Sequence, residues 1–151
     1  MSSPDPRPDY AAHLQAEIAD FRAHQGKPSR GPFVGRQVLL LTTVGARSGQ
    51  PRTVPLAYTV DGDRLIIVAS KGGSPSHPAW YANLLAQPIV TVEIGAETYR
   101  ARSEVAQGAE HERLYAQHAD LHPTFHDYRN MTRRVIPVIA LERLAEGVAS
   151  S

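Results

Sequence analysis

Short apolar segments with the composition of β-strands follow one another along this chain, and tight-turn signals separate neighbouring segments. Asp61-Gly62-Asp63 marks one such turn, and Gly95 marks another. The expected strands are Val38–Thr43, Arg52–Val60, Arg64–Ser70, Ile89–Ile94, Thr98–Val105 and Val135–Leu144. Pro55 implies that the second of them is an edge strand or contains a bulge. Strands joined by tight turns pair antiparallel, and they do not alternate singly with helices here. The pattern therefore predicts an α+β protein, with an antiparallel barrel or sheet of about six strands and attached helices.

Four helices are expected around these strands. They are Tyr10–Phe21, Pro78–Ala86, Gly108–Ala119 and a helix that begins at Pro123. Asp9 is expected to cap the first helix, and Ser74 and Ser76 are placed to cap the second. The apolar face of the second helix is expected to consist of Trp80, Tyr81, Leu84 and Leu85. Residues 1–8 hold three prolines and are expected to form a disordered tail, before a single domain over residues 9–146. Apolar residues of the first helix form a stripe, which we expect to pack on the domain. The alternative is peripheral contact of helix 10–24 with a membrane.

Composition excludes several classes of function. The chain has 151 residues and no cysteine, so it has neither disulfides nor thiolate metal ligands. Neither H-E-x-x-H, G-x-S-x-G nor G-x-G-x-x-G is present, which disfavours a zinc protease, a serine hydrolase and a Rossmann nicotinamide site. We expect no metal. We also expect no nucleic-acid partner, because the basic residues are too sparse. A cytoplasmic location is expected, since no apolar run is long enough to cross a bilayer.

Positive charge is concentrated in the first part of the chain. From Phe21 to Val92 there are eight basic residues and two acidic ones, whereas nine acids and seven bases follow from Glu93 onward. Arg47 and Lys71 lie in glycine-rich loops, and Arg52 opens a strand. Glycine-rich backbone beside fixed positive charge is typical of sites for phosphate-bearing ligands. These three cations are therefore the best candidates for an anion site, and solvated surface charges are the alternative.

Three blocks in this order give the chain its family resemblance. They read L-L-L-T-T-V-G-A-R-S-G-Q-P-R-T-V-P-L from Leu39, D-G-D-R-L-I-I-V-A-S-K-G-G from Asp61, and H-P-A-W-Y-A-N-L-L-A-Q-P from His77. R-R-V-I-P-V follows from Arg133. The chain resembles the deazaflavin-dependent nitroreductase family over roughly residues 10–144. The resemblance implies a split β-barrel, as in flavin reductases and pyridoxamine-phosphate oxidases. It also implies coenzyme F420 as cofactor, and reduction of a quinone, nitroaromatic or similar acceptor.

The same resemblance implies which residues bind the cofactor. The loop at Ala46, Arg47 and Ser48 would meet the anionic tail, and later segments would hold the phosphate and the ring, with Trp80 against the ring system. These later segments comprise Arg52, Thr53, Val54, Pro55, Leu56 and Ala57, then Val68, Ala69, Ser70 and Lys71, then Ala79, Trp80, Tyr81, Ala82 and Asn83.

The acceptor side departs from the pattern of the nitroimidazole-activating member of the family. Positions where that member has tyrosines read His122, Phe125 and Tyr128 here. Tyr128 or His122 is the candidate proton donor, and Tyr58, Phe125 and Tyr128 are candidate acceptor contacts. Two alternatives remain open at this point: an FMN-dependent oxidoreductase on the same barrel, and a deazaflavin-binding protein without catalysis. The oligomeric state is also open.

Overall fold

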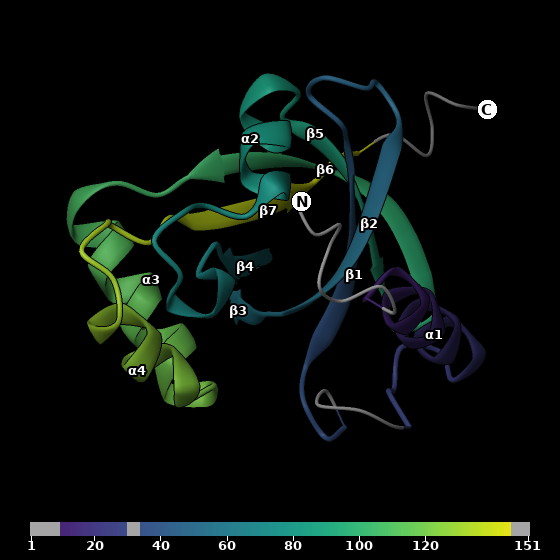
Figure 1. The fold of residues 1–151 in the computed structure, drawn as a ribbon, viewed down its shortest axis with the longest axis horizontal. Coiled ribbons are helices and arrows are strands. Elements are labelled where there is room, and N and C mark those ends of the chain that lie inside the picture. Colours follow the sequence, from purple (N-terminus) through teal and green to yellow (C-terminus); the bar gives the residue numbers. More distant parts are fainter. Residues whose placement is uncertain (1–9, 30–33, 146–151) are drawn as a thin grey trace, which may run out of the picture.

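The computed structural model describes residues 10–29 and 34–145 (Figure 1). Its helices are α1 (Tyr10–Ala23), the 3-10 turn η1 (Lys71–Gly73), α2 (Ala79–Ala86), α3 (Gly108–Leu121) and α4 (Thr124–Asn130). Its strands are β1 (Val38–Val44), β2 (Pro51–Ala57), β3 (Thr59–Asp61), β4 (Arg64–Val68), β5 (Ile89–Ile94), β6 (Glu97–Val105) and β7 (Val138–Arg143). The expected tail at residues 1–8 and the expected helix cap at Asp9 lie outside the described residues.

All seven strands form one antiparallel sheet in the order β2-β1-β5-β6-β7-β4-β3. The two end strands, β2 and β3, are consecutive in the chain and are separated only by Tyr58. The segment expected as one strand, Arg52–Val60, is thus divided: β2 pairs with β1, and β3 pairs with β4. The chain passes from one end of the sheet to the other at Tyr58, which curls the sheet into the split barrel that the resemblance implied.

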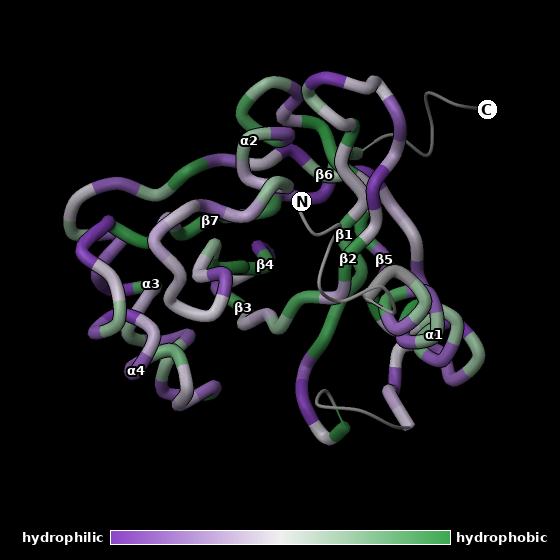
Figure 2. Tube along the Cα trace, in the orientation of Figure 1, coloured by the Kyte–Doolittle hydropathy of each residue, from purple (hydrophilic) through white to green (hydrophobic). Residues whose placement is uncertain are grey.

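Apolar side chains fill the barrel and the space beneath the helices. One buried cluster combines Leu41 of β1, Val92 of β5, Ile139 of β7 and Leu84 of α2. A second cluster lies under α3 and includes Leu114. Figure 2 shows hydrophobic residues along much of β1 and β4, while α1 combines hydrophilic and hydrophobic residues. Because successive strand residues face opposite sides of the sheet, the same strands supply both clusters.

Helix α1 packs its apolar stripe on the sheet. Ile18 and Phe21 are buried against Val38 and Leu40 of β1, and Leu14 is partly buried beside them. The expected packing of this helix on the domain is therefore confirmed. Ile18, Phe21 and Leu14 lie against the sheet, so in helix 10–24 they are not available for contact with a membrane. Among the described residues, no helix combines the length and the apolarity that crossing a bilayer requires.

Three local expectations around the later helices were wrong. Leu85 was expected on the apolar face of α2, but its side chain is exposed because the helix turns Leu84 inward. Ser74 and Ser76 were expected to cap this helix. The residue before its first turn is instead Pro78, which makes no side-chain cap. Pro123 was expected as the first residue of its helix, and it precedes the first residue, Thr124.

Candidate functional site

The turn that joins β1 to β2 carries Ala46, Arg47 and Ser48, all of them exposed. It is tied to α2 by Asn83, which is almost fully buried. The Asn83 side chain accepts a hydrogen bond from the Ala46 backbone N–H at 2.9 Å and donates one to the Thr43 hydroxyl at 3.0 Å. Two of the segments expected to meet the cofactor, the turn and α2, are therefore joined directly.

Strand β2 is exposed at its start and partly buried along the rest of its length. Arg52 is exposed at its start, while Thr53, Pro55 and Ala57 are partly buried. Val54 and Leu56, with Tyr58 just beyond the strand, pack against the barrel cluster. Burial raises the pKa of the Tyr58 phenol above its ordinary value, so this group stays protonated at neutral pH.

Val68, Ala69 and Ser70 lead out of β4 and are buried, whereas the next residue, Lys71, is exposed. Lys71 has a φ of +48°, which is unusual for a residue with a side chain. Its Nζ atom donates to the Ser76 hydroxyl at 3.3 Å. This loop therefore presents a cation on a sharply turned backbone.

Helix α2 carries Ala79, Trp80, Tyr81, Ala82 and Asn83, of which Ala79 and Ala82 are exposed. Trp80 is only 7% exposed and belongs to the barrel cluster. A planar ligand placed over this helix would therefore meet little of the indole. Tyr81 is partly buried, and its ring centroid lies 4.8 Å from that of His77.

The candidate acceptor residues lie at the end of α3 and along α4. Phe125 and Tyr128 are partly buried on the second cluster, with ring centroids 5.0 Å apart in an edge-to-face arrangement. His122 is 2% exposed, and its Nε2 atom lies 3.0 Å from the Tyr58 backbone oxygen. Burial is the main cause that lowers the pKa of His122. A buried imidazole engaged with a backbone carbonyl is poorly placed to give a proton to a ligand.

Arg47, Arg52 and Lys71 differ from many cations of this protein in their partners. Arg22 pairs with Glu93, Arg64 and Arg113 both pair with Asp61, Arg129 pairs with Glu112, and Arg143 pairs with Glu97. The three candidate cations form no ion pair with any carboxylate of the described residues. Among residues 10–29 and 34–145, no shared hydrogen-bond partner links Lys71 to the two arginines. The positive charge of these three side chains is thus not neutralised by a carboxylate of the described residues.

Sequence reasoning missed two residues that shape the loop after β4. Gly73 packs directly on α4: a Cβ atom there would lie 2.9 Å from the Met131 Cβ atom. Arg134 reaches the loop from the segment before β7 and donates to Ser70, Ser74 and His77. The motif R-R-V-I-P-V contains Arg134, but nothing in the sequence indicates where its side chain goes.

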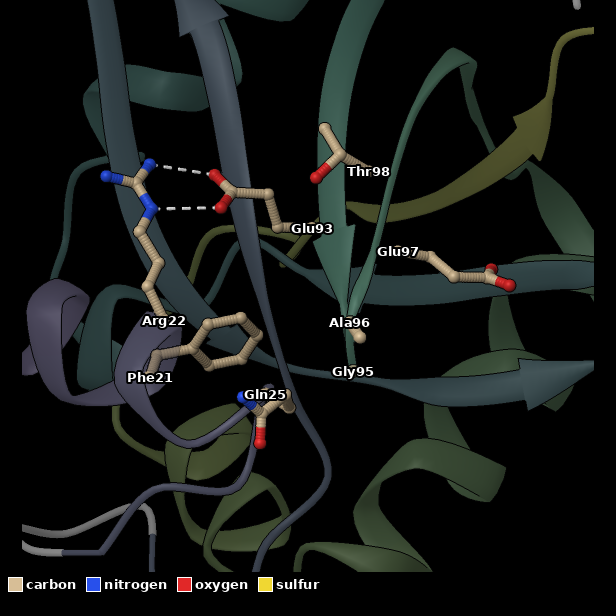
Figure 3. Close-up of a pocket in the computed structure, with 8 residues that line it drawn as sticks. All are labelled: Phe21, Arg22, Gln25, Glu93, Gly95, Ala96, Glu97 and Thr98. Atoms are coloured by element: carbon tan, nitrogen blue, oxygen red, sulfur yellow. Dashed lines mark hydrogen bonds and ion pairs between the residues drawn. The ribbon is translucent and has the colours of Figure 1, made fainter.

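A separate pocket of about 190 Å³ lies between the end of α1 and the turn that joins β5 to β6 (Figure 3). Arg22 and Glu93 form a two-bond ion pair at its side, with N···O distances of 2.9 and 2.8 Å. None of the residues expected to bind the cofactor lines it. Within the part of the chain that the structure describes, no group of three metal-ligating side chains is found.

The fold and the site residues together define a split-barrel protein with unbalanced cations on the loops around the barrel. A family model described as F420H(2)-dependent quinone reductase matches residues 9–143. The chain belongs to this family, and it is thereby an oxidoreductase of the F420-dependent class. The fold, the enzyme class and the cofactor that the resemblance implied are confirmed at this level, whereas the acceptor and the individual site residues stay predictions.

Relatives and solved structures agree with this assignment. An F420H(2)-dependent quinone reductase of Mycobacterium tuberculosis strain H37Rv is 40% identical over 110 residues, covering 70% of this chain and 72% of that protein. The solved structure of an F420-H2-dependent reductase, FDR-A, is 37% identical, with a TM-score of 0.66, and the match covers 71% of this chain and 95% of that one. Another solved chain, described as a domain-swapped dimer, is 32% identical with a TM-score of 0.68 and covers 89% and 98%.

Proposed function

We propose that this protein transfers a hydride from reduced F420 to a quinone, with the cofactor held by the loops around the split barrel. The observation that carries the proposal is the set of exposed cations without carboxylate partners. Arg47 lies in the turn that joins β1 to β2, Arg52 lies at the start of β2, and Lys71 follows β4. F420 bears a phosphate and a glutamate tail, so it is strongly anionic. The donor set fits such a ligand because fixed positive charge and free backbone N–H groups are what a polyanion needs.

Each expected segment has a part in this proposal. The turn at residues 46–48 would bind the tail, and β2 from Arg52 to Ala57 would bind the phosphate and ring edge. In the segment 68–71, Ser70 and Lys71 would add backbone N–H groups and Lys71 its ammonium, while the Ala69 N–H is held by the Pro137 oxygen at 2.9 Å. Residues 79–83 would close the site, with Asn83 fixing the turn to α2 through its two hydrogen bonds.

When bound, reduced F420 supplies a hydride, which carries two electrons and one proton. A quinone that accepts this hydride needs one further proton to become a hydroquinone. Tyr128 is our candidate for that proton donor, because its phenol is partly exposed on α4 next to Phe125. The edge-to-face pair that Phe125 forms with Tyr128 would orient the phenol, and Tyr58 would contact the acceptor ring. His122 would hold the Tyr58 backbone and take no direct part.

The cofactor site is tested by titrating the protein with oxidised F420 and, separately, with FMN. Arg52→Gln and Lys71→Gln should each weaken F420 binding by about tenfold, since a hydrogen bond to a charged group contributes roughly 1.5–3 kcal/mol. Arg102→Gln is the matched control, because Arg102 is exposed on β6, three strands away from β2. Equal losses in all three variants would show that only total charge matters. Binding of FMN in place of F420 would refute the cofactor assignment.

The proton donor is tested by quinone reduction with menadione as acceptor. Tyr128→Phe should lower kcat by roughly a hundredfold, the range of general acid catalysis, and leave the affinity for F420 unchanged. Tyr99→Phe removes a partly buried phenol from β6 and should leave turnover intact. Full turnover of Tyr128→Phe with menadione would remove Tyr128 from the mechanism. The same assay with a nitroaromatic acceptor tests whether this second class is reduced.

A further inference from the structure

The segment Ser70–His77 has an unusual backbone conformation at its start. Lys71, Gly72 and Gly73 have φ values of +48°, +63° and +79°, so three consecutive residues lie in the left-handed region. Only glycine adopts this region at low cost, and Lys71 is not a glycine. Two backbone hydrogen bonds support the turn, from Gly73 N–H to Ser70 O at 2.9 Å and from Ser74 N–H to Lys71 O at 3.1 Å. Two weaker side-chain bonds join them, from Lys71 Nζ to the Ser76 hydroxyl at 3.3 Å and from the Ser74 hydroxyl to the Ser76 backbone oxygen at 3.1 Å. A turn with three consecutive positive φ values, one of them at a lysine, needs further restraint from its neighbours.

Arg134 supplies that restraint on one side. Its guanidinium donates from Nη2 to the Ser70 backbone oxygen at 2.7 Å and from Nε to the Ser74 backbone oxygen at 2.9 Å. Its Nη1 atom donates to the His77 Nδ1 atom at 2.8 Å. The planar fork of arginine can reach three acceptors in fixed directions, which a lysine ammonium cannot reproduce. One side chain thus fixes the start, the middle and the end of the segment.

The hydrogen bond from Arg134 also determines which nitrogen of the neutral His77 ring carries the proton. Because Nδ1 accepts from Arg134, the proton of the neutral imidazole must be on Nε2. Burial and the neighbouring charge of Arg134 lower the pKa of His77, which keeps the ring in this neutral form. The His77 side chain is exposed, so its Nε2–H group points away from Arg134 with a defined donor role.

Helix α4 restrains the segment on the other side. A Cβ atom on Gly73 would lie 3.0 Å from the Tyr128 backbone oxygen, so the loop backbone touches the helix that carries Tyr128. Figure 1 shows the segment between β4 and α2 passing beside α4. Lys71 and Tyr128, which the proposed function places at the cofactor and at the acceptor, are therefore joined through Gly73 and braced by Arg134.

We propose that Arg134 is a positioning residue, which holds the segment Ser70–His77 in the shape that binds the cofactor and thereby sets Lys71 relative to Tyr128. The inference rests on the proposed function for the identity of the ligand. Its structural half, that Arg134 orders this loop, is independent of any ligand and has its own measurement.

The test uses Arg134→Gln and Arg134→Lys in the full chain, with Arg133→Gln as the matched control. Arg133 is adjacent, exposed and without a hydrogen bond or ion pair to the described residues. In the ligand-free protein, amide hydrogen exchange at Gly73 and Ser74 should become about tenfold faster in both Arg134 variants and stay unchanged in the control. Nitrogen NMR of His77 should show loss of the single Nε2–H tautomer. Unchanged exchange and an unchanged tautomer would overturn the proposal.

The cofactor measurements separate positioning from general stability. For both Arg134 variants, the Kd of F420 and the KM of its reduced form should rise by roughly 10- to 100-fold, while kcat at saturating cofactor stays near that of the wild type. A merely structural role would reduce the folded fraction, so it would lower kcat and leave the Kd of the folded protein unchanged. Full rescue by Arg134→Lys would show that charge alone matters and would overturn the positioning role.

Two further outcomes are distinguishable. If Arg134→Gln did not fold, His77→Phe would replace it, because that change keeps a ring but removes one of the three acceptors and leaves the other two bonds. It should accelerate exchange at Ser74 by about threefold, and unchanged exchange would count against the proposal. If the wild-type protein bound no F420, the proposed function would fail, and loop exchange in the Arg134 variants would still decide whether this residue orders the segment.

Discussion

His118 makes the stability of this protein depend on pH in a predictable direction. Its side chain is 0% exposed, and its Nε2 atom has no hydrogen-bond partner among the described residues. Its Nδ1 atom lies 3.3 Å from the Thr59 hydroxyl, and Phe125 packs edge-on against its ring at 4.5 Å. Burial, with a smaller contribution from the neighbouring His122, lowers the pKa of His118 from 6.5 to about 3.

The direction of the pH effect on stability depends on whether the folded or the unfolded state binds the proton more tightly. The unfolded chain takes up a proton on His118 as the pH falls through 6.5, whereas the folded protein resists protonation down to a pKa of about 3. Unfolding is therefore favoured progressively below pH 6.5, and full stability is present above it. Between pH 8 and pH 5, the two pKa values give a loss of about 2 kcal/mol in the free energy of unfolding from this group alone.

Urea unfolding at pH 8, 7, 6 and 5 measures this effect. His118→Leu removes the titrating group and should lose about 2 kcal/mol less than the wild type over this range. Leu114→Ala is the control, because Leu114 is fully buried on the same helix and does not titrate. It should lower stability by roughly 2–5 kcal/mol at every pH and keep the pH dependence of the wild type. If His118→Leu and wild type declined in parallel, or NMR gave His118 a folded pKa near 6.5, the reasoning would be refuted.

Two packing predictions concern the residues that shape the site. Gly73→Ala should destabilise the fold by about 1–3 kcal/mol in urea unfolding, because the backbone has a φ of +79° that alanine adopts only with strain, and because the new methyl group meets Met131. A loss below about 0.5 kcal/mol would show that α4 moves aside. Asn83→Ala should cost about 1–3 kcal/mol by thermal or urea unfolding, because it leaves a buried hydroxyl on β1 and a backbone N–H of the next turn without partners, and Leu85→Ala on the exposed side of the same helix should cost much less.

The positions of the strands could be predicted from sequence because each is a short apolar run bounded by a turn signal. The break at Tyr58 could not. Pro55 suggested an edge or a bulge, and it lies in β2 opposite Leu40 of β1, three residues before the break. The chain divides at Tyr58 because one continuous run must pair with β1 at one end of the sheet and with β4 at the other. That requirement belongs to barrel closure, and no local signal encodes it.

Exposed cations without carboxylate partners among the described residues were predictable where charge and glycine occur together in sequence, as at Arg47 and Lys71. Contacts between residues far apart in the sequence were not predictable, whether a long side chain or a close backbone approach makes them. Arg134 lies 64 residues from Ser70, whose carbonyl it holds. The burial of Trp80 was not predictable either. A tryptophan near a glycine-rich loop suggests a ligand contact, whereas the packing of α2 places most of this side chain in the core.

The break at Tyr58 also explains how the acceptor side is fixed to the barrel. A residue between two strands has a carbonyl that need not join either ladder. Here the Tyr58 oxygen lies 3.0 Å from the His122 Nε2 atom, at the residue where α3 ends and the chain turns into α4. A continuous strand would commit that carbonyl to the sheet. The closure of the barrel therefore frees a backbone carbonyl that contacts His122, just before the helix carrying Phe125 and Tyr128. In the proposed function, the strand that binds the cofactor and the helix that meets the acceptor are thus positioned by the same break.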